Sequence, residues 1–360
     1  MSMDYYQSRY PIESIINEYS IQESSEPARD FSRWRKPKKI AIQLQPNDNH
    51  EEIRLLNAFQ QICDTIPLIT FYDSLEPLTQ HEDIDVVIGL ADNRILKITN
   101  NIRWIHSYEV GVEVYTCYAN IEDYPILLTN NQGLAANDTA QHAITFMLML
   151  ARGMLTYRDK QLQHQWPDNV FSSTRSSTLK NKCLLVIGIG NIGSEVARLA
   201  SGLGMNVSGI GLSQRSHHPY VSHIGGMEDL HPYAMKADFI INCLPLTKKT
   251  KALIDKHFFD AAKPGAYYIN IGRGETTVTE DLIHALEVGQ LSGAGLDVIH
   301  PEPLPASHKI WSIDNTIITP HVAAVSADTW ERGMAVALEN TRRYIRGDKL
   351  LNMVDIQKGY

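Results

Sequence analysis

The sequence predicts an α/β fold with parallel sheets. Short apolar segments typical of strands alternate with segments of helical spacing, and this alternation occurs twice, once from Lys39 and again from Lys182. Strands that are joined through helices pair in parallel and form a sheet covered by those helices. A chain of 360 residues is also long enough for about two domains, each with its own core.

The first 36 residues come before this pattern. They are rich in Tyr, Ser and Glu and show little periodicity, so we expect residues 1–36 to form an N-terminal extension. A solvated linker is the simple interpretation of the basic cluster near its end, and a targeting or docking patch is the alternative. The cluster consists of Arg33, Arg35, Lys36, Lys38 and Lys39.

The first alternating block begins at Lys39. Its pattern predicts a helix at residues 50–63 and strands at residues 39–44, 66–72, 85–88 and 102–106. A longer apolar helix is predicted at residues 138–154. Its apolar run, Ala143–Ala151, is much shorter than the roughly 20 residues of a membrane span. We therefore expect a buried helix.

The second block begins at Lys182. A helix is predicted at residues 194–202, and another begins at Thr279, whose side chain is able to cap it. Six strands are predicted, at residues 183–187, 206–210, 238–242, 266–271, 293–297 and 316–319.

Composition limits the classes of partner. The net charge is −8 and the sequence pI is near 6.0, so neither nucleic acid nor a membrane is expected as a partner. The first ten residues are polar and aromatic, unlike a signal peptide. Four scattered cysteines lack the spacing of a zinc site, so no metal site is expected and the protein is predicted to be cytoplasmic. They are Cys63, Cys117, Cys183 and Cys243.

The segment Gly188–Gly193 has the sequence GIGNIG. Alone, this motif is a weak signal, because glycine-rich turns are common. Here it directly follows an apolar strand and directly opens a helix. Glycines in such a turn let a pyrophosphate approach the backbone, and the helix start supplies N–H donors and positive potential. The context therefore favours a dinucleotide site over an ordinary turn.

Polar side chains follow several predicted strands of the second block. Arg273 follows the fourth strand, Asp297 ends the fifth with Glu302 shortly beyond it, and His321 follows the sixth. Each has a simple alternative as a surface arginine, a solvated carboxylate or a loop histidine. In open parallel sheets, however, ligands bind at the carboxyl ends of the strands. A cation, carboxylates and an imidazole at this edge indicate a catalytic site beside the dinucleotide.

Four longer segments resemble the signatures of a known family. They are ADFIINCLPLTKKTKALID, KPGAYYINIGRGE, GAGLDVIHPEPLP and ITPHVAA. On these motifs the chain resembles the D-isomer-specific 2-hydroxyacid dehydrogenases, strongly over residues 182–355 and more weakly over residues 38–152. The first 36 residues lie outside the resemblance.

The resemblance implies two doubly wound parallel-sheet domains. A Rossmann dinucleotide-binding domain, residues 136–321, would be inserted in a flavodoxin-like substrate domain made of residues 37–135 and 322–360. Relatives are usually homodimers, and the apolar helix at residues 143–150 would supply the contact. Trp166 matches an aromatic residue that reaches a neighbouring subunit's site in some relatives, with surface packing as the alternative.

The resemblance also implies catalytic roles. His321 would be the general acid that protonates the ketone oxygen as hydride arrives from a nicotinamide. Glu302 would orient His321 and raise its pKa. Arg273 would bind the substrate carboxylate and polarise its carbonyl group. Gly272 stands before it where alanine or serine is usual, which loosens the backbone.

Further substrate contacts are implied in the first block. The segment SYEVGV resembles the loop whose backbone N–H groups hold the substrate carboxylate, at Val110 and Gly111. An ordinary turn glycine is the alternative for Gly111. Glu109 is unusual beside an anion site, and we expect its side chain to point away. Tyr108 and Trp330 would form pocket walls suited to a small or mid-sized 2-keto acid.

The cofactor would lie along the carboxyl ends of the second block's strands. Asp297 would accept a hydrogen bond from the nicotinamide carboxamide. The other residues expected along the cofactor are Gly188, Gly190, Asn191, Ile192, Gly193, Ser213, Arg215, Leu244, Pro245, Thr250 and Ile271.

The residue after the second strand bears on the choice of cofactor. An acidic residue there normally binds the adenosine ribose and repels a 2′-phosphate, but this chain has Gly211. Ser213 and Arg215 are then able to bind the phosphate. We therefore expect NADP to be preferred, with NAD as the other candidate. In the alternative, Arg215 is a solvated loop residue and either cofactor is accepted.

These interpretations predict an oxidoreductase that transfers hydride between NAD(P)H and a small 2-keto acid, such as glyoxylate, hydroxypyruvate or pyruvate, to give a D-2-hydroxy acid. Two sister enzymes are alternatives. Formate dehydrogenase pairs its histidine with glutamine, which Glu302 argues against. Phosphoglycerate dehydrogenases often carry a regulatory domain, for which residues 322–360 leave no room. The same fold also serves nucleotide-sensing corepressors, which need no turnover.

Overall fold

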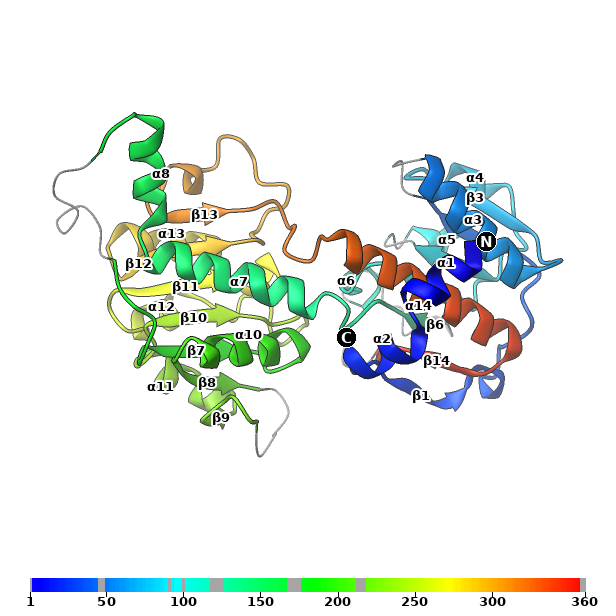
Figure 1. Ribbon diagram of the computed structural model, residues 1–360, viewed down its shortest axis with the longest axis horizontal. Coiled ribbons are helices and arrows are strands. Elements are labelled where there is room, and N and C mark those ends of the chain that lie inside the picture. Colours follow the sequence, from blue (N-terminus) through cyan, green and yellow to red (C-terminus); the bar gives the residue numbers. More distant parts are fainter. Residues whose placement is uncertain are drawn as a thin grey trace. The chain divides into compact units, whose positions relative to one another are not determined.

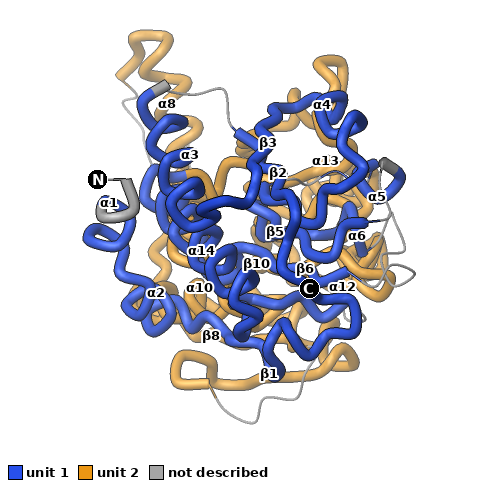
Figure 2. The backbone as a smooth tube through the Cα atoms, turned by 90° about the vertical axis from the view of Figure 1, so that its right-hand side faces the viewer, with its two compact units in different colours: residues 1–135, 326–360 blue, residues 136–325 orange. Residues whose placement is uncertain are grey.

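The chain forms two compact units, which Figure 2 distinguishes by colour. Unit 1 combines Met1–Ala135 with Ser326–Tyr360, and unit 2 is the continuous segment Ala136–Val325. Unit 2 is thus inserted into unit 1. The computed structural model describes residues 2–44, 49–89, 92, 94–98, 101–116, 126–166, 176–211 and 218–356.

Unit 2 contains a seven-stranded parallel sheet in the order β13-β12-β11-β10-β7-β8-β9. The chain starts at β7, moves to one edge through β8 and β9, and then returns to build the other half. Doubly wound sheets bind ligands at such a reversal, here between β7 and β10, outside the carboxyl ends of the strands. The strands are β7 (Cys183–Ile187), β8 (Asn206–Ile210), β9 (His223–Gly225), β10 (Phe239–Asn242), β11 (Ala266–Asn270), β12 (Leu291–Leu296) and β13 (Thr316–Ile318).

Helices cover both faces of this sheet (Figure 1). The central strands are continuous apolar runs because both of their faces are buried. The predicted apolar helix is α7, and most of its apolar side chains lie in the core. Within the part of the chain that the structure describes, no helix is long and apolar enough to cross a membrane. One face carries α7 (Ala136–Ala151) and α10 (Asn191–Gly202), the other α11 (Leu230–Ala234), α12 (Lys256–Ala261) and α13 (Thr279–Glu287), and α8 (Met154–Leu162) follows α7.

Unit 1 contains a five-stranded parallel sheet in the order β3-β2-β4-β5-β6. The chain reverses direction between β2 and β4, which is the flavodoxin-like type of doubly wound sheet. The strands are β2 (Ile40–Gln43), β3 (Leu68–Phe71), β4 (Val86–Gly89), β5 (Trp104–Ser107) and β6 (Leu127–Thr129). One face carries α3 (Asn49–Cys63) and α14 (Ala327–Arg346), and the other carries α4 (Glu76–Thr79), α5 (Ile95–Ile98) and α6 (Glu113–Thr116).

The predicted fold class is confirmed, because both units are doubly wound parallel sheets covered by helices. Every predicted strand occurs, with small shifts at its ends. The sequence does not predict β6 and β9, because each has three residues and is too short to show periodicity. The predicted cap of α13 is also wrong. The hydroxyl of Thr279 donates instead to the His300 carbonyl oxygen at 2.7 Å, and Val278 is the N-cap residue.

The N-terminal segment, which we expected to form an extension, packs as part of unit 1. It forms α1 (Ser2–Arg9), α2 (Ile12–Glu18) and β1 (Glu23–Pro27), and β1 pairs antiparallel with β14 (Lys349–Leu351). Tyr6 of α1 is buried in the core that α3 and α14 share. The apolar residues of these short elements are too few to show a period, so the sequence does not reveal their burial.

The basic cluster also takes part in packing, so the solvated-linker interpretation is wrong at Arg35. Its Nε donates to Oδ1 of Asp85 at 2.7 Å, and the Asp85 carboxylate is completely buried. The other carboxylate oxygen accepts from the Lys38 N–H at 2.6 Å, and Arg103 Nε lies 3.5 Å from Oδ1. A buried carboxylate needs such partners, because leaving it unpaired is costly. Asp85 therefore anchors the N-terminal segment to the sheet.

We expect Asp85→Asn to lower the free energy of unfolding by about 3 kcal/mol, because two arginines then lose a buried counter-ion. Asp83→Asn is the matched control. Asp83 lies nearby at the surface, 2.6 Å from Lys39 Nζ, and its loss should cost less than about 1 kcal/mol. Urea unfolding of both variants measures the difference. Equal losses would contradict the anchoring role.

Candidate active site

The glycine-rich turn joins β7 to α10 in unit 2. Gly188 follows β7 with φ of +99°, a conformation that glycine adopts without steric cost. Gly193 lies in the first turn of α10. A Cβ atom there would stand 2.0 Å from the Gly188 carbonyl oxygen, so only glycine permits this close packing of helix on strand. These two glycines are therefore required by the protein's own packing.

Gly190 has a different environment. It is the N-cap residue of α10, and no described atom lies within 4 Å of the position that its Cβ would take. Asn191 and Ile192 begin the helix. The N–H groups of a first helical turn have no partners within the helix and carry positive potential. An open, positive helix start without a side chain in front of it fits the pyrophosphate of a dinucleotide.

The loop after β10 contributes the next predicted residues along the edge. Leu244 is buried and Pro245 follows it. The fully buried Thr250 closes this loop, because its hydroxyl donates to the Pro245 carbonyl oxygen at 2.6 Å and accepts from the Thr247 N–H at 2.8 Å. Thr250 therefore contributes the shape of the loop.

The end of β11 lies against this loop. Ile271 is buried and Gly272 follows it. A Cβ atom on Gly272 would stand 2.5 Å from the Leu244 carbonyl oxygen. Close packing of two backbones thus gives a structural reason for glycine at this position.

Asp297 is a buried carboxylate after β12, and it fixes the segment that carries His321. Oδ1 accepts from the Val322 N–H and Oδ2 from the Ala323 N–H, both at 2.9 Å. The backbone oxygen of Asp297 accepts from the His321 N–H at 2.9 Å, and the Thr319 hydroxyl donates to Oδ1 at 2.6 Å. These bonds hold His321 at φ of +56°, a left-handed conformation that costs energy for a residue with a side chain.

The imidazole of His321 is paired with Glu302. Nδ1 lies 2.9 Å from Oε2, and Oε1 accepts from the Ile299 N–H at 2.9 Å. The hydrogen bond to Glu302 raises the pKa of His321, outweighing burial and the charge of Arg273. Burial alone would raise the pKa of Glu302, but the bonds from His321 and Ile299 and the Arg273 charge lower it. The pair therefore favours an imidazolium beside a carboxylate.

Arg273 follows β11 in the same unit. Its Nη1 donates to the Gly272 carbonyl oxygen at 2.7 Å. Its charge acts on both Glu302 and His321. Unit 2 by itself thus brings together a cation, an imidazole and a carboxylate at the carboxyl edge of its sheet. The catalytic roles of the three residues stay predictions.

The sequence does not single out one polar residue beside this group, His142. Nε2 of His142, on α7, lies 3.0 Å from the Thr319 hydroxyl and 3.7 Å from Oδ1 of Asp297. The His142 ring packs edge-on against Phe146, with the ring centroids 4.6 Å apart. The available signal is a histidine in an apolar helix, and that alone does not distinguish a core residue from a site residue.

The predicted substrate residues lie in unit 1. Val110 and Gly111 stand between β5 and α6, and Glu109 beside them is exposed. Tyr108 packs edge-on against Trp330 of α14, with the ring centroids 5.4 Å apart.

Several predicted residues bear on the cofactor or the assembly. Ser213 and Arg215 lie outside the described residues. The cysteine Cys117 also lies outside them, and the other three cysteines are free thiols. Gly211 follows β8, and its N–H donates to the Gly225 carbonyl oxygen at 3.1 Å. The side chain of Trp166 is 93% exposed.

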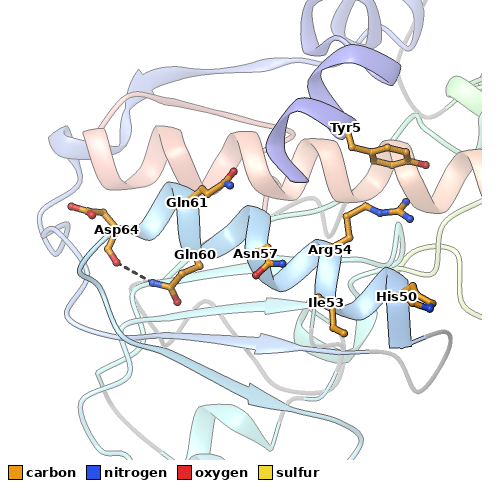
Figure 3. Close-up of a pocket in the computed structure, with 8 residues that line it drawn as sticks. All are labelled: Tyr5, His50, Ile53, Arg54, Asn57, Gln60, Gln61 and Asp64. Atoms are coloured by element: carbon orange, nitrogen blue, oxygen red, sulfur yellow. Dashed lines mark hydrogen bonds between the residues drawn. The ribbon is translucent and has the colours of Figure 1, made fainter. Parts of the chain in front are cut away.

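Unit 1 also has a hollow of about 810 Å³ on the outer side of α3 (Figure 3). The guanidinium of Arg54 lies 4.2 Å from the centroid of the Tyr5 ring, which reaches over from α1. None of the predicted site residues lines this hollow. Its lining residues are Tyr5, His50, Ile53, Arg54, Asn57, Gln60, Gln61 and Asp64. Over the described ranges, no three His, Cys, Asp or Glu residues are grouped to hold a metal ion.

Known proteins are similar to this chain in sequence and in fold. Residues 144–323 match the family described as D-isomer specific 2-hydroxyacid dehydrogenase, NAD binding domain. The glyoxylate/hydroxypyruvate reductase A of Photorhabdus laumondii is 30% identical over 236 residues, which are 66% of this chain and 72% of that protein. The chain belongs to the D-isomer specific 2-hydroxyacid dehydrogenase family. Members of this family are NAD(P)-dependent D-2-hydroxyacid dehydrogenases.

Two further comparisons agree with this membership of the dehydrogenase family. The glyoxylate reductase of Pyrococcus furiosus is 28% identical over 288 residues, which are 75% of this chain and 82% of that protein. The solved structure of a D-isomer specific 2-hydroxyacid dehydrogenase family protein from Aeromonas salmonicida has a TM-score of 0.74 at 28% identity. The match covers 89% of this chain and 99% of that chain.

We expect two glycine-to-alanine changes in this dehydrogenase to separate folding from cofactor binding. Gly193→Ala should lower the free energy of unfolding by about 1–3 kcal/mol, because its methyl group has no room beside Gly188. Gly190→Ala should leave the melting temperature within about 2 °C. It should nevertheless weaken NAD(P)H binding about tenfold, because the methyl group blocks close approach of the pyrophosphate.

Thermal melts and titration of NAD(P)H by fluorescence measure the two effects. An unchanged cofactor affinity in folded Gly190→Ala would show that the pyrophosphate lies elsewhere.

Proposed function

We propose that the protein reduces a small 2-keto acid to a D-2-hydroxy acid, with NADPH as the preferred hydride donor. The observation that carries this proposal is the 2.9 Å contact between His321 and Glu302, within reach of the Arg273 charge. A protonated imidazole and a fixed cation are the groups that reduction of an anionic ketone requires. The glyoxylate reductase names of two relatives support a substrate of this class.

In the proposed reaction, Nε2 of His321 donates a proton to the ketone oxygen. Nδ1 faces Glu302, whose charge stabilises the imidazolium and holds the ring in one orientation. Arg273 binds the substrate carboxylate and polarises the neighbouring carbonyl group, since its planar guanidinium matches a carboxylate. NADPH, when bound, supplies the hydride.

The same edge of unit 2 suits the cofactor. The pyrophosphate would meet Gly190 and the N–H groups of Asn191 and Ile192, where the helix start is open. Asp297 would bind the nicotinamide carboxamide with a carboxylate that already accepts two backbone N–H groups. Each carboxylate oxygen has two lone pairs, so Oδ2 retains one for this contact.

The NADPH preference rests on Gly211. No carboxylate is present at this position after β8 to repel a 2′-phosphate. Ser213 and Arg215, beyond the described residues, would donate hydrogen bonds to that phosphate.

The small substrate and the assembly have separate support. Tyr108 lies two residues before Val110 in sequence, and its ring packs against Trp330 within unit 1, which favours a short substrate side chain. Dimerisation through α7 stays a proposal, which the exposed side chain of Leu148 on that helix supports.

The test is reduction of glyoxylate, hydroxypyruvate and pyruvate with NADPH and with NADH. We expect turnover, with kcat/KM higher for NADPH. His321→Ala should lower kcat by about 10²–10⁴-fold with little change in cofactor Kd, the usual effect of losing a general acid. His284→Ala, at an exposed position on α13, is the control.

Absence of turnover with every keto acid would refute the proposed activity. Near-native turnover in His321→Ala would refute only the role of the histidine, and a cofactor ratio below one would refute only the NADPH preference.

The raised pKa of His321 predicts how the reaction depends on pH. Reduction needs the imidazolium, so the rate should hold at acid pH and fall as pH rises through the raised pKa. Glu302→Gln keeps a hydrogen-bond acceptor but removes the charge, so this limb of the profile should move to lower pH. Glu287→Gln, which breaks a surface pair with Lys309, should leave it in place. An unmoved limb in Glu302→Gln would mean that another group sets it.

A further inference from the structure

The loop that is proposed to hold the substrate carboxylate is itself held by two buried asparagines. Asn130 and Asn131 directly follow β6 and are 2% and 6% exposed. Nδ2 of Asn130 donates to the Val110 carbonyl oxygen at 2.7 Å, and Nδ2 of Asn131 donates to the Tyr108 carbonyl oxygen at 3.0 Å. The two side chains therefore bind alternate carbonyl groups of the segment after β5.

The bond from Asn130 determines the direction of a backbone N–H. In a trans peptide, the carbonyl group of residue 110 and the N–H of residue 111 point in opposite directions. Because Asn130 holds the Val110 oxygen, the Gly111 N–H is turned away from Asn130. Among the described residues, this N–H has no hydrogen-bond acceptor, and Gly111 is partly exposed. A fixed N–H without an acceptor is a prepared donor for a carboxylate.

The two asparagines are in turn fixed by their surroundings. Oδ1 of Asn130 accepts from the Gln132 N–H at 3.2 Å, so the amide cannot turn without losing two bonds. Asn131 lies close to the buried ring of His106, although its Oδ1 makes no hydrogen bond among the described atoms. Burial lowers the pKa of His106 to about 3, so the ring is neutral. Nδ1 of His106 lies 2.8 Å from the Thr129 hydroxyl of β6. A neutral polar network thus braces the loop from within.

We propose that Asn130 is a positioning residue for the substrate, which aims the Gly111 N–H at the substrate carboxylate by holding the Val110 carbonyl. This inference rests on the proposed function. It identifies a residue that sets the affinity of the proposed site for the substrate carboxylate. A donor is required at this position, because only a donor binds a carbonyl oxygen.

Asn130→Leu tests this proposal, because leucine is similar in size and has no donor. It should raise KM for glyoxylate about tenfold with a smaller change in kcat, and leave the NADPH Kd within about twofold. The Kd of oxalate, measured by calorimetry with NADP⁺ present, should rise in parallel with KM. Asn340→Leu is the matched control. Asn340 is a fully buried asparagine of unit 1 whose Nδ2 donates to the Leu351 carbonyl oxygen at 3.0 Å, so it loses the same kind of bond.

Unchanged KM and oxalate Kd in folded Asn130→Leu would overturn the proposal, as would equal changes in Asn340→Leu. If Asn130→Leu does not fold, Asn130→Ser takes its place, because serine is too short to make the same bond. The oxalate titration separates this proposal from the proposed function. A native protein that reduces no keto acid refutes the function, whereas oxalate binding that does not depend on Asn130 refutes the positioning role. A native protein that does not bind oxalate refutes the positioning role as well.

Discussion

Parallel pairing of all seven strands is the constraint on which the site in unit 2 depends. Because neighbouring strands run in one direction, each strand delivers its carboxyl end to the same edge. The residues along this edge are then ordered by strand position and not by sequence. With neighbouring strands about 4.8 Å apart, the row from β8 to β13 extends for roughly 24 Å. That row sets the expected ribose end, at Gly211, far from the reacting end, at His321, and leaves the open start of α10 between them.

Buried polar groups then fix the loops that leave this edge. Strands hold one another through their backbones, but a loop at a carboxyl edge has unpaired N–H and carbonyl groups that need partners. Asp297 supplies them for the His321 segment, and Thr250 does so for the loop after β10. The left-handed backbone of His321 persists because three hydrogen bonds to Asp297, from Val322, Ala323 and His321 itself, outweigh its cost. The position of His321, the proposed proton donor, therefore depends on Asp297.

The sequence predicts most of this architecture, because strands buried on both faces and glycines under steric demand leave strong local signals. The short strands β6 and β9 leave none, and their existence depends on neighbours already in the sheet. The packing of the N-terminal segment is not predicted for a similar reason. Tyr6 is buried only because α3 and α14 lie beside it, and Arg35 is paired only because Asp85 lies fifty residues away in sequence. Contacts of this kind are absent from any local pattern.

The site residues also differ in whether the sequence identifies them. The sequence identifies three candidates because they follow predicted strands, whose carboxyl ends bind ligands in α/β sheets. These candidates are Arg273, Glu302 and His321. His142 lies within a helix, and Asn130 and Asn131 follow β6, a strand that the sequence does not predict. Nothing local marks which carbonyl or hydroxyl group these buried side chains bind. A histidine or asparagine in the sequence acquires its role from the partner that the fold supplies.

The chemistry of each anchor also decides which backbone groups a loop presents. In unit 2 the anchor is Asp297, a carboxylate, which accepts and therefore draws N–H groups inward. The His321 segment is then left to act through its side chain. In unit 1 the anchors are Asn130 and Asn131, which donate and therefore draw carbonyl groups inward. Since each peptide points its N–H opposite to its carbonyl group, the Gly111 N–H is turned outward for the proposed ligand, while the Glu109 N–H donates to the Ser107 hydroxyl at 3.1 Å. A loop that must bind an anion through its backbone needs donors behind it, and an aspartate at position 130 would present only acceptors to the Val110 oxygen.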